Sequence, residues 1–319
     1  MQPISRYLFS GLVAAFAVAC LYEMRGDLAH ISIAPLLRSW DLIVLAAVCS
    51  LLNYGFRIFR WQSYLARLGR RLPLGFIGLT YVAGFAFTVS PGKVGEMARA
   101  RYYSRLGVSL SDVAGAFFVE RLMDVMAMLV LAALMATAAP RYPVAMWSAG
   151  IMVVAVLVCL SWTPWDAIAR WFEAAHSFPR VVARLGAGAT RALGAARTLL
   201  SPSALLCGFL LGLAAWGLEG VGFFVLGSMF PDAHLTLMLG AGIYAVAVLV
   251  GAISFLPGGL GSTEAVMAAL LTAQGFTVAD ALLVTIVCRI VTLWLAVLIG
   301  WAAVFVLRNR LEPAVSSWP

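Results

Sequence analysis

The sequence predicts an all-α polytopic membrane protein, and three observations support that fold class. Of the 319 residues, 63% are hydrophobic and 11% are charged, whereas a soluble domain is about half apolar and about a quarter charged. The mean hydropathy is +0.97. Several apolar runs reach the roughly 17–25 residues that span a bilayer, and no stretch is long and polar enough to fold as a separate soluble domain. We therefore expect a single integral membrane domain over residues 1–319.

Six apolar runs are expected to cross the membrane as full helices: 7–22, 41–60, 111–137, 145–163, 204–229 and 281–307. The first run has the length of a signal peptide, but its flanks lack a small-residue cleavage site, so we interpret it as a retained span. Two further stretches, 73–105 and 236–273, are each split by a Pro-Gly turn. Each half is too short to cross ~30 Å of hydrocarbon, which predicts two re-entrant helical hairpins.

Arginines indicate the topology. With six crossings and both chain ends inside, one face receives Arg6, Arg57, Arg60, Arg67, Arg70, Arg71, Arg99, Arg101, Arg105, Arg170, Arg180, Arg184, Arg191, Arg197, Arg308 and Arg310. Only Arg25, Arg38 and Arg141 fall outside, so the positive-inside rule makes that face cytoplasmic. The basic loop 164–203 is either an interfacial amphipathic helix or a solvated connector. The net charge of +8 indicates anionic lipid headgroups as partners, not nucleic acid.

The sequence contains an internal repeat. PGKVG (91–95, the first turn) matches PGGLG (257–261, the second turn); after a two-residue insertion, Gly107 matches Gly275, Asp112 matches Asp280 and Arg121 matches Arg289. The first copy is expected over 41–137 and the second over 204–307. Because three predicted crossings separate the turns, the second copy is inverted. Inverted repeats with broken helices are typical of transporters, whose sites lie where the broken helices meet.

The turn residues suit a broken backbone at membrane depth. Proline ends the incoming helix, and glycines permit a tight turn and close approach of neighbouring chain. Ser262 or Thr263 is expected to cap the next helix. Helix N-termini that point into the membrane favour an anion such as phosphate. The residues assigned to the turns are Pro91, Gly92, Gly95, Pro257, Gly258, Gly259, Gly261, Ser262 and Thr263.

Ionisable residues at span depth cost roughly 2.5–3.5 kcal/mol each on insertion scales, so they usually face partners or water. The candidates for a substrate path are Lys93, Glu96, Glu120, Arg121, Asp124, Glu219, Glu264 and Arg289. We expect Arg121 and Arg289 to reach one cavity from opposite copies and to hold an anionic headgroup. The carboxylates either orient these arginines, carry a proton or meet a cationic headgroup. Alternatively, ERLMD (120–124) is a neutral ion-pair network between helices.

Other polar and aromatic residues receive no functional role. Arg99 and Arg101 are expected to snorkel to the interface. Interface anchoring or packing is expected of Tyr81, Trp216, Tyr244 and Trp294. No metal-ligand spacing or disulfide framework is found among Cys20, Cys49, Cys159, Cys207 and Cys288, or among His30, His176 and His234. No catalytic, ATP-binding or cofactor motif is recognisable, so we expect neither enzyme activity nor a cofactor.

Three segments resemble the lysylphosphatidylglycerol synthase transmembrane family, which includes stand-alone proteins of the UPF0104 group: VSPGKVGE (89–96), VSLSDVAGAFFVERLMD (108–124) and FLPGGLGSTEAVMAALL (255–271). The resemblance covers about residues 40–307. It implies a lipid flippase in which Lys93, Glu96, Glu120, Arg121, Asp124, Glu264 and Arg289 line the lipid path. One departure is the lysine of PGKVGE, where relatives often show arginine.

The leading expectation is therefore a translocase that moves a phospholipid, or an aminoacyl, glyco-, hopanoid or polyprenyl lipid, across the bacterial inner membrane. A secondary transporter of a small soluble anion is one alternative, and a membrane-embedded transferase acting on a lipid is another. A separate lipid-synthesising enzyme is an expected partner. Small residues in GFLLGLAAWGLEGVG (208–222) suit tight helix packing or a homodimer.

Overall fold

The computed structural model describes residues 34–138, 163–164, 167–168, 170–171, 180–231, 233 and 235–315, and every regular element in this part of the chain is a helix. The prediction of an all-helical fold is confirmed for these residues. The predicted spans 7–22 and 145–163 lie outside the described residues. So do Cys20, Cys159 and all three histidines.

Three of the described helices are long and apolar enough to cross a membrane. The first is α4 (Trp40–Arg67), which follows the short α3 (Ala34–Arg38), and the second is α11 (Pro202–Gly227). The third runs continuously through Val278–Asn309. These helices correspond to the predicted spans 41–60, 204–229 and 281–307. Helix α4 continues a further seven residues beyond its predicted end, and this extension places Arg60 inside the helix.

Helix α7 (Leu110–Ala138) is 29 residues long and carries the ERLMD segment. It packs against α10 (Arg180–Thr198), α11 and α12 (Leu237–Ile253). The basic connector is therefore helical over α10 and lies against the bundle. At this contact a β-carbon on Gly115 would lie 2.5 Å from the Ala192 carbonyl oxygen, so the two backbones approach closely.

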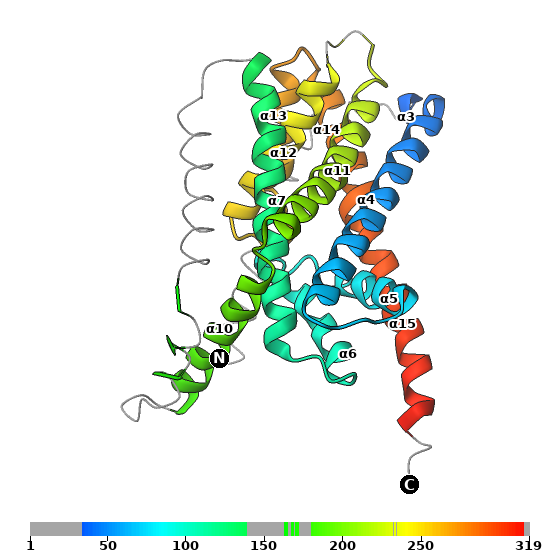
Figure 1. The fold of residues 1–319 in the computed structure, drawn as a ribbon. Coiled ribbons are helices and arrows are strands. Elements are labelled where there is room, and N and C mark those ends of the chain that lie inside the picture. Colours follow the sequence, from blue (N-terminus) through cyan, green and yellow to red (C-terminus); the bar gives the residue numbers. More distant parts are fainter. Residues whose placement is uncertain are drawn as a thin grey trace.

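The first broken stretch comprises α5 (Leu74–Phe85), a 3₁₀ segment η1 (Pro91–Arg99) and the short α6 (Ala100–Ser104). In Figure 1 α5 and α6 both lie toward the lower end of the bundle. The returning half is mostly 3₁₀ where an α-helix was expected. Gly95 explains the tight geometry: its N–H donates to Ser90 Oγ at 2.6 Å, and a β-carbon there would lie 2.5 Å from the Phe87 carbonyl oxygen.

The second broken stretch comprises α12, the short η2 (Pro257–Gly259) and α13 (Ser262–Thr272), toward the upper end in Figure 1. Gly258 and Gly259 have φ of +63° and +67°, a left-handed conformation that favours glycine. The predicted cap is wrong. Gly261 is the N-cap of α13, and its N–H donates to Glu264 Oε2 at 2.6 Å. Ser262 is the first helical residue, and Thr263 Oγ1 packs against Gly251 and Gly259.

The residues matched between the two sequence copies have the same local structure. Gly107 follows α6 with φ +72°, and Gly275 follows α13 with φ +93°. The next helix is capped alike in each copy: Ser109 Oγ accepts the Asp112 N–H at 3.0 Å, and Thr277 Oγ1 accepts the Asp280 N–H at 3.1 Å. The residues that match in the sequence therefore occupy equivalent helix ends in the structure.

The two turns touch near the middle of the bundle, where η1 contacts η2. A β-carbon on Gly258 would lie 3.5 Å from the Val89 α-carbon. Beside this contact α14 (Val278–Arg289) passes into a π-helical segment η3 (Ile290–Trp294) and then α15 (Leu295–Val315). Tyr54 of α4 donates to the Thr292 carbonyl at 3.0 Å and ties α4 to this segment.

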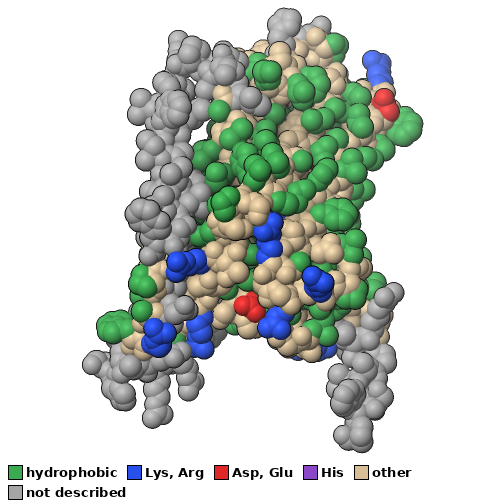
Figure 2. Space-filling model, in the orientation of Figure 1, with side chains coloured by type: hydrophobic (Ala, Val, Ile, Leu, Met, Phe, Trp, Pro, Cys, Tyr) green, Lys and Arg blue, Asp and Glu red, His purple; other side chains and the backbone are tan. Residues whose placement is uncertain are grey.

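Many large hydrophobic side chains are exposed on the described helices, as expected of a helix bundle in lipid. Figure 2 shows hydrophobic side chains over the upper part of the visible face and basic side chains mainly over the lower part. Three glycines of α11 pack against other helices of the chain: Gly212 lies against Arg60, Gly220 against Ala241 and Gly222 against Ala46. Tight helix packing is thus their observed use.

Candidate functional site

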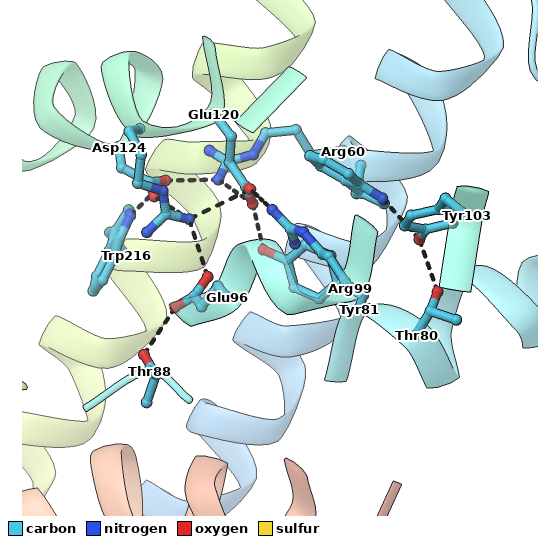
Figure 3. Close-up of polar contacts among 12 residues, drawn as sticks. Arg60, Thr80, Tyr81, Thr88, Glu96, Arg99, Tyr103, Glu120, Asp124 and Trp216 are labelled. Atoms are coloured by element: carbon cyan, nitrogen blue, oxygen red, sulfur yellow. Dashed lines mark hydrogen bonds and ion pairs between the residues drawn. The ribbon is translucent and has the colours of Figure 1, made fainter. Parts of the chain in front are cut away.

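Six ionisable side chains form one network, and Figure 3 labels five of them. We call it the carboxylate cluster: Glu96, Glu120 and Asp124 with Arg60, Arg99 and Arg121. Its members come from α4, η1 and α7, so the cluster joins segments far apart in the sequence. Five of the six residues are at most 4% exposed, and the Arg121 side chain is 21% exposed.

Glu120 lies at the centre of the cluster (Figure 3). One oxygen accepts from Arg99 Nη2 at 2.7 Å, and the other accepts from Arg60 Nη2 at 3.3 Å and from the Tyr81 hydroxyl. The Arg99 guanidinium also stacks 3.7 Å from the Trp61 ring centroid. These donors satisfy a carboxylate that has no contact with solvent, as a buried charge requires.

Asp124 and Glu96 extend the cluster on either side. Asp124 Oδ1 accepts from Arg60 Nη2 at 2.6 Å and from Trp216 Nε1 at 2.9 Å. The Arg121 guanidinium lies 3.0 Å from Asp124 and 3.8 Å from Glu96. Glu96 also accepts from the Thr88 hydroxyl at 2.8 Å.

Because three carboxylates oppose three guanidinium groups, the carboxylate cluster is neutral as a unit. It therefore matches the ion-pair-network interpretation of ERLMD. It also corrects two placements: Arg60 was expected on the cytoplasmic face and Arg99 at the interface, but both are 0% exposed. Arg101, by contrast, is exposed as expected. Tyr81 and Trp216, which received no role from the sequence, are donors to this network.

A second ion pair occupies the matching position in the other copy. Arg289 Nε donates to Glu264 Oε1 at 2.5 Å, and Arg289 Nη2 donates to the Gly258 carbonyl at 2.6 Å. Arg289 thus braces the second turn. The interval between Glu264 and Arg289 is 25 residues, the same as that between Glu96 and Arg121.

A cavity of about 290 Å³ lies between the two turns. Of the predicted residues, its wall includes Lys93, Arg121, Asp124, Glu219, Gly258, Gly259, Thr263 and Arg289. Glu96, Glu120 and Glu264 stand behind this wall, paired to arginines. The cavity also brings in residues that the sequence did not single out: Asn53, Tyr54 and Arg57 of α4, with Trp216 and Tyr244.

Arg57 was expected on the cytoplasmic face, but it lines the cavity, so it is the cation whose position sequence reasoning missed. It is 5% exposed, and in the described part of the chain no carboxylate lies within 4.0 Å of it. Its guanidinium carbon lies 5.3–5.8 Å from the ring centroids of Phe85, Trp216 and Tyr81. Nε and Nη2 have no hydrogen-bond partner. Aromatic faces stabilise the charge but leave these N–H groups free for an acceptor.

Among the cations that line the cavity, Lys93 is the second for which the described residues supply no carboxylate within 4.0 Å. Its Nζ lies 5.2 Å from the Trp216 ring centroid, so Trp216 is shared with Arg57. Its φ is +56°, a conformation that costs a non-glycine residue of order 1–3 kcal/mol. In the second turn the equivalent position is Gly259, also left-handed. Glycine would adopt this conformation without that strain, so the lysine side chain is present at a cost in backbone energy.

Glu219 contributes a carboxylate to the wall of the cavity. It is 4% exposed and accepts from Asn53 Nδ2 at 2.6 Å and from Ser50 Oγ at 3.0 Å. Neither partner carries a charge. Ser50, Asn53 and Arg57 recur at helical spacing along α4 and share one face. That polar stripe within an apolar run was the signal in the sequence that could have identified Arg57.

Comparison with known proteins agrees with this picture of a membrane bundle. The family described as "Lysylphosphatidylglycerol synthase TM region" matches residues 7–300. The chain belongs to this family. A similar protein is a "UPF0104 membrane protein" of Methanothermobacter thermautotrophicus (strain Delta H), 24% identical over 318 residues that cover 94% of this chain and 93% of the relative. The family resemblance inferred from the motifs is confirmed, and with it a membrane location.

Proposed function

We propose that this member of the lysylphosphatidylglycerol synthase transmembrane family is a lipid translocase of the inner (plasma) membrane that moves a headgroup carrying a negative charge between leaflets. The observation that carries the proposal is the pair of free cations, Arg57 and Lys93, around Trp216 in a cavity between the two turns. Unpaired charges at membrane depth are costly, and they persist where a ligand or water meets them.

The proposed path follows an inverted repeat. In this scheme α5, η1 and α6 form a re-entrant hairpin from the cytoplasmic side, and α12, η2 and α13 form one from the opposite side. The equal Glu–Arg intervals and the equivalent helix ends support the repeat. The headgroup site in this proposal is the contact between the turns, which is the position that substrate sites take in inverted-repeat transporters.

Access from lipid favours a lipid over a soluble anion. Ala252 lines the cavity and is an exposed residue. Beside it, Ile253 and Phe255 are 74% and 72% exposed, a surface suited to acyl chains. A cavity of about 290 Å³ accommodates a headgroup, while the acyl chains stay outside in lipid. Arg121 and Arg289, both ion-paired, act as positioning residues for the two turns.

The test is movement of fluorescent lipids in liposomes that contain the purified full chain, with outer-leaflet probe quenched over time. Protein-dependent movement is expected for a negatively charged phospholipid, and Arg57→Gln should slow it at least tenfold. The matched control is Arg101→Gln, which removes an exposed cation and should leave the rate unchanged. Equal loss in both variants would contradict the role of Arg57.

The same liposomes discriminate the alternatives. A soluble-anion transporter would take up labelled inorganic phosphate and move no lipid, and a membrane transferase would convert the probe into a product seen by chromatography. Repeating the assay with an imposed pH gradient or membrane potential separates passive movement from coupled movement.

A further inference from the structure

The cavity has an acidic arm, which we define as Ser50, Asn53 and Glu219. Glu96, Glu120, Asp124 and Glu264 each have an arginine within 4.0 Å. Glu219 differs, because in the described residues its polar partners are only the amide of Asn53 and the hydroxyl of Ser50. Its charge is therefore solvated by neutral donors and not cancelled by a protein cation.

The Asn53 amide leaves one acceptor free. A carboxylate only accepts hydrogen bonds, so the amide must turn its Nδ2 toward Glu219. Asn53 is 1% exposed and lines the cavity, and its Oδ1 has no hydrogen-bond partner. An orphaned buried acceptor is destabilising, because burial removes its hydrogen bonds to water and nothing replaces them. A ligand that donates a hydrogen bond would remove that cost.

The free donors of Arg57 and Lys93 lie around Trp216, which is one helical turn from Glu219 on α11. Trp216 and Glu219 are separated by about 4.5 Å along the helix axis. Arg57 and Lys93 surround Trp216, and the acidic arm surrounds Glu219. The cavity thus offers free N–H donors near Trp216 and a free acceptor, Asn53 Oδ1, near Glu219.

Charge decides what kind of headgroup fits. The carboxylate cluster and the Glu264–Arg289 pair are each neutral. Two free cations and one carboxylate remain, which leaves the cavity with one positive charge when Glu219 is ionised. A ligand with one net negative charge neutralises it, whereas a zwitterionic headgroup does not.

We infer that the cavity binds a monoanionic phosphodiester headgroup whose attached alcohol bears free hydroxyls, such as a glycerol or a sugar. The phosphate lies against Arg57 and Lys93, and a hydroxyl donates to Asn53 Oδ1 and the acidic arm. This inference rests on the proposed function, because it names the class of lipid that the translocase takes.

The experiment is equilibrium binding of dioctanoyl lipids to the detergent-solubilised full chain at pH 7, by calorimetry. Phosphatidylglycerol and phosphatidylmethanol carry the same charge, but only the first has hydroxyls. We expect phosphatidylglycerol to bind about tenfold more tightly, the effect of one hydrogen bond to a charged or buried acceptor. It should also bind more tightly than zwitterionic phosphatidylethanolamine. Equal binding of phosphatidylglycerol and phosphatidylmethanol would overturn the inference.

Glu219→Gln keeps the shape of the side chain and raises the cavity charge to two positive. This variant should shift preference toward dioctanoyl phosphatidate, whose phosphate monoester carries a larger negative charge, by about tenfold relative to phosphatidylglycerol. A merely structural Glu219 would lower thermal stability without changing that ratio. Asn53→Leu should reduce the advantage of phosphatidylglycerol over phosphatidylmethanol to less than about threefold, while Arg101→Gln should leave it unchanged.

The binding assay and the transport assay test the headgroup assignment and the translocase proposal separately. If phosphatidylglycerol binds with the expected order but no lipid moves in liposomes, the headgroup assignment stands and the translocase proposal fails. If lipids move with no preference among these headgroups, the translocase stands and the monoanionic polyol assignment fails.

Discussion

The first and second turns share a sequence pattern and an ion pair, yet they differ in what surrounds them. The first turn belongs to the carboxylate cluster, with Glu96 and Arg99 buried at 1% and 0% exposure. The second turn has a single ion pair, in which the Glu264 side chain is 25% exposed. Where the first turn carries Lys93, the second has Gly259, whose β-carbon would lie 2.6 Å from Thr263 Oγ1.

This difference indicates that the two turns are suited to different tasks. The second turn is packed too closely for a side chain and contributes a backbone wall that Arg289 braces. The first turn holds a strained lysine and is anchored by a rigid polar network. Anion binding is therefore expected to depend on the first turn, and closure of the cavity on the second.

The largest expected effect is on the free energy of unfolding. It should fall more when the carboxylate cluster is disrupted than when the Glu264–Arg289 pair is disrupted. Glu120→Ala leaves Arg60 and Arg99 buried without their shared carboxylate, which should destabilise the fold by about 3–5 kcal/mol. Glu264→Ala removes a partly exposed partner and should cost about 1 kcal/mol. Thermal unfolding in detergent measures both. Asp112→Asn, which disrupts an exposed pair with Arg70 at 3.6 Å, is the control and should change little. Similar melting temperatures for the two glutamate variants would contradict the expected difference in stability between the two ion-pair systems.

A smaller effect on stability and a clear effect on transport are expected from Lys93→Gly, which gives the first turn the residue of the second. Relief of the left-handed conformation should leave stability unchanged or raise it by about 1 kcal/mol. Lipid movement should fall at least tenfold, because one of two free cations is lost. Unfolding curves and liposome assays on one preparation give both readouts, and retained transport would show that Lys93 serves only the turn.

The smallest effects concern the helix ends that the copies share. Gly107 and Gly275 both have positive φ, and nothing lies within 4 Å of a β-carbon built on either. Gly107→Ala and Gly275→Ala should therefore each cost about 1 kcal/mol through backbone strain alone. Equal melting shifts would show that these ends are equivalent in energy as well as in geometry.

The sequence predicted the helical fold and several of the charged residues that line the cavity, since membrane helices and buried charges are costly choices that leave clear patterns. Lys93, Arg121, Glu219 and Arg289 were identified because each interrupts an apolar run, and all four line the cavity. Arg57 was missed because it precedes a series of arginines at the end of an apolar run, where snorkelling to the surface is the usual outcome.

The remaining errors have a common physical origin. Whether an arginine near a helix end is buried depends on which carboxylates face it from other helices. Arg99 is 0% exposed because Glu120 and Trp61 meet it. Likewise Gly261, and not Ser262, caps α13, because Glu264 reaches back to the Gly261 N–H. Neither arrangement follows from local propensity.

The carboxylate cluster also constrains how the protein is made. Arg60 and its partner Glu120 are 60 residues apart, and Trp216 follows Asp124 by 92 residues. At about 5–20 residues per second, the ribosome completes α7 several seconds after α4 has been released. During that interval the Arg60 guanidinium has no carboxylate partner and must remain near the headgroups. We therefore expect α4 to reach its final depth only after α7 has been made.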